Sequence, residues 1–383
     1  IEARTDRHLW AESYERDLRD ILALQREVAR TVAAEIRTRV TPQERGRLAG
    51  GRPVNPKAYE AYLRGRYHWL RLREEDFDTA VRYFRQSTEV DPAFAPAYSG
   101  LADCYVWLAY LYFRPPMEYL PKARAAALKA LELDETLAEA HASLGSVALA
   151  YDWDWKTAER EFQRAIELSP SSAGAHFNYN FYLIALGRYE EGLAEARRTL
   201  ELDPLTPWNQ LRLGWSLMNA HRHQEAIPAL HQALELDPNV PRAHMLLAIN
   251  YALLGDFQQA LAHCPKALAV PQDLAPRAYC GWAYARAGQP QQARKLLEQL
   301  QEASRYRHVD SYYIAFLYDG LRDRERTLEY LERAYQERSP SMPFLKKPLV
   351  FADLAGDPRF QDLLRRMKFP VSYTHLTLPT NRE

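Results

Sequence analysis

The chain has 383 residues, of which 26% are charged and 47% are hydrophobic, a balance typical of a folded protein. Its 50 basic and 50 acidic residues cancel, so no basic excess indicates a nucleic-acid or anionic-membrane partner. No run of about 18 apolar residues occurs, so the sequence predicts no membrane span.

Residues 1–46 carry one apolar stripe with three- and four-residue steps. Its members are Trp10, Tyr14, Leu18, Ile21, Leu24, Val28, Val32, Ile36 and Val40. The stripe predicts a helix of roughly 25–30 residues that ends near Thr41-Pro42. A coiled coil is the alternative, because the stripe lasts for about four heptads.

The segment from Arg4 to Gln25, with Trp10, Tyr14 and Leu18 in it, resembles the end of the TolB amino-terminal-like domain. In multidomain bacterial signalling proteins this module lies between an effector and a repeat array. The effector is a winged-helix regulator, a Ser/Thr kinase or a nucleotide cyclase. The resemblance implies that residues 1–46 are a strand remnant and a long helix of a sensor module, cut from a longer reading frame. Residues 47–56, which contain Gly50-Gly51 and two prolines, predict a linker.

A fixed period follows the linker. Pro170, Pro204 and Pro238 are 34 residues apart, and small residues keep the same step at Ala158, Gly192, Ala226 and Ala260. Such a period predicts stacked supersecondary units. In the unit that ends at Pro238, Leu213-Gly214-x-x-Leu217 precedes Ala226, Leu230 and Ala233. This pattern resembles the tetratricopeptide repeat, two antiparallel helices joined by a turn.

The resemblance implies an all-α, right-handed superhelical solenoid of about eight helical pairs over residues 57–338. Three departures from the repeat stand out: a widened turn from Trp69 to Asp76, an insertion from Leu108 to Glu118, and Pro265, where a kink or an early helix end is expected. Residues 339–370 predict a break and then a C-terminal capping helix that begins at Asp357-Pro358. Residues 371–383 resemble the translated read-through of a sequencing adaptor, and we expect an artefact there.

The sequence predicts no catalytic, cofactor-binding or metal-binding residue, and therefore no enzyme activity in this chain. No phosphate-binding loop, Gly-x-Ser-x-Gly elbow or kinase catalytic loop occurs. His221 and His223 are two positions apart in a turn, and a first-shell metal site needs three or four converging ligands. A disulfide between Cys264 and Cys280 is one alternative, but we expect all three cysteines to be small buried residues of helices.

Binding candidates come from the first helix of each pair, which lines the concave face in this repeat class. Large aromatic, Met and Arg side chains at exposed positions are typical of binding surfaces. The alternative is that they pack against the neighbouring repeat or fill a tight groove. The candidates are Trp107, Phe177, Phe181, Trp208, Trp215, Met218, Asn219, Met245, Trp282, Arg286, Tyr312 and Phe316. Leu213, by contrast, is expected in the core, so Leu213→Ala should destabilise the array while Trp215→Ala should weaken only partner binding.

The partner expected on the concave face is a protein or peptide ligand, or another domain of the same chain. Neither the Lys and Asn carboxylate clamp of chaperone-tail readers nor an asparagine ladder is present, so an apolar helix or an extended peptide is favoured. The function expected is protein recognition within a larger bacterial signalling or transcription-control protein. The alternatives are the regulatory arm of a kinase or cyclase and a scaffold that recruits two partners. Homo-oligomers stay open, and a cytoplasmic location is favoured unless a membrane span lies upstream.

Overall fold

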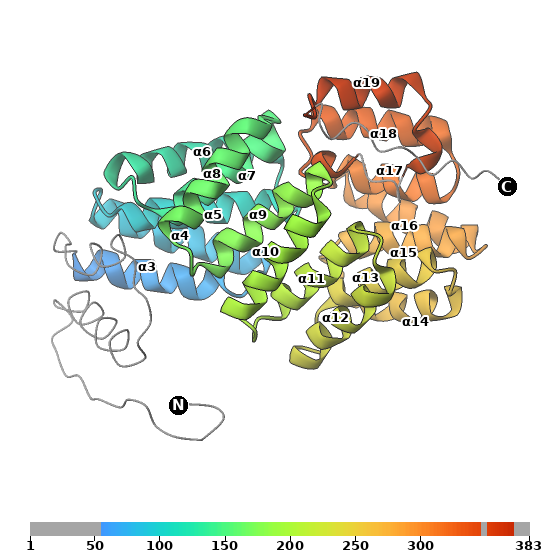
Figure 1. Cartoon of the computed structure of the whole chain (residues 1–383), viewed down its shortest axis with the longest axis horizontal. Helices are drawn as coiled ribbons and strands as arrows, with labels where there is room; N and C mark the ends of the chain where they lie inside the picture. Colours follow the sequence, from blue (N-terminus) through green and yellow to red (C-terminus); the bar gives the residue numbers. More distant parts are fainter. Residues whose placement is uncertain (1–54, 346–350, 371–383) are drawn as a thin grey trace.

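The computed structural model describes residues 55–345 and 351–370, and these residues form 17 α-helices without a strand (Figure 1). The predicted all-α class is therefore confirmed. The predicted module in residues 1–46 and the predicted artefact in residues 371–383 lie outside the described residues. The helices are α3 (Pro56–Trp69), α4 (Glu74–Val90), α5 (Ala95–Tyr110), α6 (Pro116–Leu133), α7 (Ala138–Val147), α8 (Trp155–Leu168), α9 (Ala173–Leu186), α10 (Tyr189–Leu202), α11 (Pro207–Asn219), α12 (His223–Leu236), α13 (Pro241–Leu253), α14 (Phe257–Ala267), α15 (Ala275–Arg286), α16 (Pro290–Ala303), α17 (Ser311–Gly320), α18 (Arg324–Gln336) and α19 (Pro358–Arg366).

Helices α3 to α18 form eight antiparallel pairs, and each pair packs on the next along the array (Figure 1). Helix α19 follows two short 3₁₀ turns, Met342–Phe344 and Ala352–Leu354, and packs on α18. It begins where the sequence predicts, because the Asp357 carboxylate accepts a hydrogen bond of 2.8 Å from the backbone N–H of Arg359. Helix α14 ends two residues after Pro265, which is the expected early end.

At a spacing of 33 or 34 residues, a left-handed residue recurs in the turn that joins the two helices of a pair. Gly187 (φ 78°), Gly255 (φ 82°) and Gly288 (φ 76°) hold this position. Glycine suits it because a Cβ atom is strained at positive φ. Three other repeats put a residue with a side chain at the same step, namely Trp153 (φ 54°), His221 (φ 60°) and Arg322 (φ 61°).

Small residues recur because the two helices of a pair touch at them. A Cβ atom added to Gly214 of α11 would lie 2.6 Å from Leu230 Cγ of α12, far inside normal van der Waals contact. A Cβ atom added to Gly192 of α10 would lie 2.7 Å from Ile184 Cδ1 of α9, and Ala158, Ala226 and Ala260 at the same step are fully buried. The period thus records the positions where only a small side chain lets the helices approach.

The array curves until its first and last pairs meet. Arg307, before α17, forms an ion pair of 3.2 Å with Glu74 of α4. The loop after α5 carries Tyr112, whose hydroxyl is hydrogen-bonded to Ser341 Oγ at 2.6 Å. The rings of Tyr112 and Tyr313 lie edge to face at 4.7 Å.

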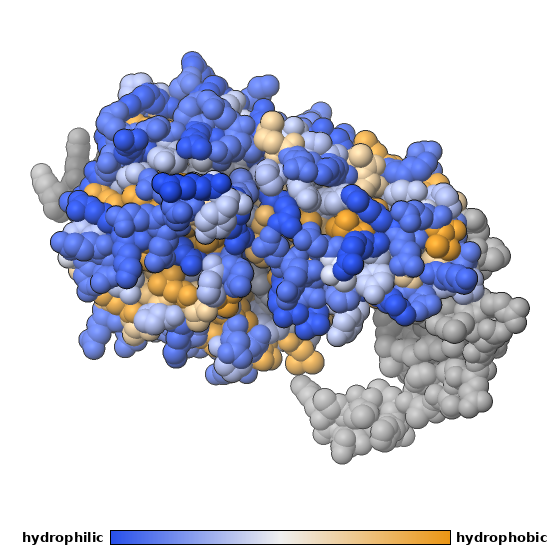
Figure 2. All heavy atoms as spheres, turned by 180° about the vertical axis from the view of Figure 1, so that it is seen from behind, coloured by the Kyte–Doolittle hydropathy of each residue, from blue (hydrophilic) through white to orange (hydrophobic). Residues whose placement is uncertain are grey.

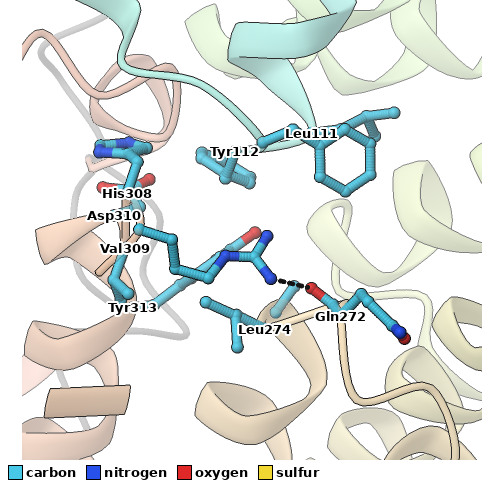
Figure 3. A pocket seen from close by; sticks show the side chains of 11 residues that line it. Leu111, Tyr112, Gln272, Leu274, His308, Val309, Asp310 and Tyr313 are labelled. Atoms are coloured by element: carbon cyan, nitrogen blue, oxygen red, sulfur yellow. Dashed lines mark hydrogen bonds between the residues drawn. The ribbon is translucent and has the colours of Figure 1, made fainter. Parts of the chain in front are cut away.

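Figure 3 shows this contact from close by, with Tyr112 and Leu111 opposite His308, Asp310 and Tyr313. A cavity of only about 10 Å³ remains between them. The predicted insertion after α5 therefore joins the N-terminal part of the array to its C-terminal part through Tyr112.

The outer surface is mostly hydrophilic, with smaller hydrophobic patches on the face seen from behind (Figure 2). Ion pairs such as Arg198–Glu201 and Arg326–Glu329 lie on the second helices of their pairs and are well exposed. These charges are the solvated faces of amphipathic helices, as the sequence suggests. Within the part of the chain that the structure describes, no helix combines the length and the apolar character that a membrane span requires.

Candidate functional site

A groove of about 530 Å³ lies in the N-terminal half of the array. Its helical walls come from α3, α5, α7, α9 and α11, all of them first helices of pairs, as the sequence analysis expects. Trp69, Trp107 and Trp208 contribute indole rings to the wall. Leu70 and Leu205 lie in loops on the rim and are 65% and 77% exposed. An apolar surface that remains this open to water is typical of a binding site.

Four acidic and two basic residues line the groove, so its charge balance is negative. The acidic residues are Asp103, Glu139, Asp203 and Asp237, and the basic residues are Arg66 and Arg71. Arg71 also lies 3.6 Å from the carboxylate of Asp76, which reduces its effect in the groove. Burial in the groove wall raises the pKa of Asp103 to about 7, against the lowering effect of Arg66.

A second cavity, of about 110 Å³, lies deeper inside the curved array. It shares Trp107, Leu111 and Trp208 with the groove, so the two spaces adjoin at these three side chains. Phe344 and Ser341 close its other side. Phe344 packs its ring against those of Trp215 and Phe181 at 5.3 and 5.8 Å. The residues after α18 therefore occupy part of the concave face.

Two arginines line this inner cavity, and their surroundings differ. Arg242 forms a two-pronged ion pair with Asp273, with N–O distances of 2.9 and 3.2 Å. Arg212 is 5% exposed and forms no hydrogen bond or ion pair with the described residues, and its Nε is fully buried. Its guanidinium lies instead over the rings of Phe181, Phe177 and Trp215, at 3.4, 4.1 and 4.8 Å.

The structure divides the twelve predicted contact residues into three groups. The residues of the first group line the groove or the inner cavity: Trp107, Phe177, Phe181, Trp208, Trp215, Met245 and Tyr312. Met218, Asn219, Trp282 and Phe316 are buried between helices and line neither space. Arg286 is exposed and covers the Trp282 ring at 5.4 Å.

The assumed exposure is wrong for seven of the twelve, which are buried: Phe177, Met218, Asn219, Met245, Trp282, Tyr312 and Phe316. These residues lie on the first helices of their pairs, but neighbouring parts of the curved array bury their side chains. The expected contrast between Trp215 and Leu213 also changes. Trp215 is packed under Arg212 and against Phe344, and Leu213 is only half-buried. Removal of the Trp215 side chain should therefore cost stability as well.

Sequence reasoning missed several residues of the site, among them Trp69, Leu70, Asp103, Leu111, Leu205 and Arg212. Arg212 lies between Trp208 and Trp215 at helical spacing, so the same step along α11 could have found it. Asp103 precedes Trp107 by one turn and carries the same signal. Leu111 and Leu205 lie in loops, where helical spacing gives no signal.

The three cysteines lie among the described residues and are packed in the core. Cys104, Cys264 and Cys280 are free and buried, so the disulfide left open by the sequence is not formed. Burial raises the pKa of the Cys104 thiol well above its usual range. Among the described residues, no three His, Cys, Asp or Glu side chains converge as a metal site would require.

Two family models with the description tetratricopeptide repeat match residues 211–276 and 281–303. Among solved structures, the APC/C hetero-tetramer Cut9–Hcn1 has a TM-score of 0.53 at 17% identity. The match covers 79% of this chain and 54% of that one. A human IFIT1 dimer has a TM-score of 0.51 at 16% identity and 72% coverage of both chains. At these identities the two structures show the fold alone.

Two curated bacterial proteins are similar in sequence. One is a Rhizobium meliloti protein that is named as an adenylate cyclase (adenylate cyclase 3). It is 31% identical over 162 residues, and the match covers 42% of this chain and 27% of the relative. The transcriptional regulator HilA of Salmonella typhimurium is 29% identical over 132 residues, 34% of this chain and 24% of the relative. The match thus spans about a quarter of the length of either relative.

Proposed function

Because this chain is a tetratricopeptide-repeat protein, we propose that it is a non-catalytic recognition scaffold that holds a segment of a partner protein in the groove between α3 and α11. The observation that carries the proposal is the groove itself. It is lined by the first helices of five successive pairs and has apolar side chains on an open rim.

The occupant that fits is an extended peptide with large apolar side chains. Leu70 and Leu205 each keep well over half of their surface in contact with water, so an apolar side chain placed on them would remove that surface from water. Trp69, Trp107 and Trp208 offer flat aromatic surfaces in the same groove. Aromatic residues in a concave site commonly supply most of the binding energy.

The charge of the groove favours a basic residue in the same peptide. Asp103 and Glu139 line the wall without an ion pair to a described residue, and Arg66 is the one cation near them that influences the pKa of Asp103. A Lys or Arg side chain of the ligand would therefore be attracted, and an acidic peptide would be repelled.

The setting we propose is the regulatory part of a larger bacterial protein. The two curated relatives support it, because one is named as a cyclase and the other as a transcriptional regulator. An effector of either class is compatible with a non-catalytic array that binds a protein segment. The bound segment then belongs to a separate partner or to another domain of the same protein. In the cyclase case the array is the regulatory arm of an enzyme.

The test selects peptides that bind the purified chain from a library of random ten-residue peptides. The affinity of the best peptide is then measured by fluorescence anisotropy. We expect selected peptides to combine Leu, Phe or Trp with Lys or Arg. Leu205→Lys places a charge on the rim and should weaken binding at least about tenfold.

Leu128→Lys is the matched control, because Leu128 is 53% exposed on α6 and does not line the groove. Both variants add the same charge to the chain, so a general electrostatic effect would affect them equally. Equal affinities for Leu205→Lys and Leu128→Lys, or a selection dominated by acidic peptides, would refute the proposed site.

A further inference from the structure

The inner cavity contains a cation, Arg212, that has no hydrogen-bond or ion-pair partner among the residues that the structure describes. Arg212 is buried and has no acidic neighbour among the described residues, whereas Arg242 on the same cavity wall is neutralised by Asp273. Within the described part of the chain, no Asp or Glu side chain lines the cavity. The described part of its wall therefore carries one positive charge that no described carboxylate compensates.

An unpaired buried charge is unfavourable unless something compensates for it. The three aromatic rings around Arg212 supply part of the compensation through their electron-rich faces. They accept no hydrogen bond comparable to those of a carboxylate, and burial still lowers the pKa of Arg212 well below its usual range. A guanidinium has five N–H donors and prefers a planar acceptor with two oxygens.

From this arrangement we infer that the inner cavity is a binding site for a small free carboxylic acid, held by its carboxylate on Arg212. The cavity volume of about 110 Å³ is smaller than the roughly 150 Å³ of an engineered cavity that binds benzene, so only a small acid fits. Phe181, Trp215 and Tyr279 contribute aromatic surface to the wall, so an acid with a compact apolar body fits. The carboxylate forms charge-assisted hydrogen bonds that replace the missing internal partner.

The site is separate from the peptide groove, although the two share a boundary. A small acid would enter past Trp107, Leu111 and Trp208, which line both spaces. The inference does not depend on the proposed peptide ligand. Either one holds if the other fails, because the acid is tested with no peptide present.

The experiment measures thermal unfolding of the chain with benzoate and with benzamide. The two molecules have nearly the same shape, but only benzoate carries a charge. We expect benzoate to raise Tm with the logarithm of its concentration above the Kd, by about 2 °C at tenfold excess, and benzamide to leave Tm unchanged. Isothermal titration then gives the Kd of benzoate directly.

Arg212→Met keeps much of the side-chain volume and removes the charge, so it should weaken benzoate binding at least about tenfold. Arg286→Met is the matched control, because Arg286 also lies over a tryptophan ring but is exposed and away from the cavity. It should bind benzoate like the parent chain. Arg212→Lys keeps the charge and gives a second variant in case Arg212→Met does not fold.

Three outcomes would overturn the inference. The first is no rise in Tm with millimolar benzoate, acetate or phenylacetate, and the second is an equal rise with benzamide. The third is an Arg212-dependent response to acidic peptides but not to any free acid, which would assign the carboxylate to a partner chain.

Discussion

Gly214→Ala is the substitution that most directly tests how the repeats are held together. In an isolated helix this change is favourable by about 0.5–1 kcal/mol, because glycine loses more conformational freedom on folding. In the array the new Cβ atom would lie 2.6 Å from both Cγ and Cδ2 of Leu230, which is fully buried. Normal carbon contacts are about 3.5–4.0 Å, so the Leu230 side chain must move by about 1 Å.

Such overpacking of a filled core costs about 1–3 kcal/mol, which exceeds the gain in helix propensity. We therefore expect Gly214→Ala to lower the free energy of unfolding by about 1–2 kcal/mol. Gly174→Ala on α9 is the control. Its nearest contact would be Ser172 Oγ at 3.9 Å, so the same change should stabilise the chain by about 0.5 kcal/mol.

The assay is urea unfolding followed by circular dichroism at 222 nm, with the midpoint compared at equal slope. Leu230→Ala provides a further arm, because it removes the side-chain atoms that the new methyl group at position 214 would meet. In that background Gly214→Ala should no longer be destabilising, which gives a coupling energy of about 1–2 kcal/mol in the double-mutant cycle. A midpoint that rises for Gly214→Ala as it does for Gly174→Ala would refute the close-contact explanation of the period.

Two further predictions concern the turns and the closure of the array. Arg322→Gly should stabilise the chain by about 0.5–1 kcal/mol, because Arg322 is exposed and glycine relieves its left-handed strain; a lower urea midpoint would contradict this. Burial lowers the pKa of His308 to about 4, so its neutral form is favoured by folding and its contribution is lost as pH falls from 6.5 towards 4. The difference in unfolding free energy between the parent chain and His308→Gln should therefore change by about 1–2 kcal/mol from pH 7 to pH 5, and an unchanged difference would exclude His308 as the titrating group.

The repeat architecture could be predicted from the sequence because it depends on local spacing. Ala226 and Gly214 mark helix contacts within one pair, and the pair is encoded by residues fewer than about 20 positions apart. The left-handed turns follow the same step, even where Trp153 or His221 replaces glycine. Local pattern and observed fold agree here.

The site could be predicted only in part. First helices line the groove, but the closure of the array depends on contacts such as Tyr112–Ser341, which join residues 229 positions apart. No period links such positions. The same residue types also serve both roles, since Trp208 lines the groove while Trp282 is buried with its indole N–H bonded to Asp319. Spacing alone cannot separate a contact tryptophan from a packing one.

The closure also decides where a ligand can act on this array. Phe344 and the loop with Tyr112 fill the surface that an open solenoid would offer, so a large partner is left with the groove and its rim. The inner cavity adjoins the groove at Trp107, Leu111 and Trp208. An acid bound at Arg212 and a peptide bound in the groove would therefore both lie next to these three side chains. Any effect of one ligand on the affinity of the other must then be equal in both directions. A scaffold whose affinity for a protein partner changes when a small molecule binds must meet this requirement.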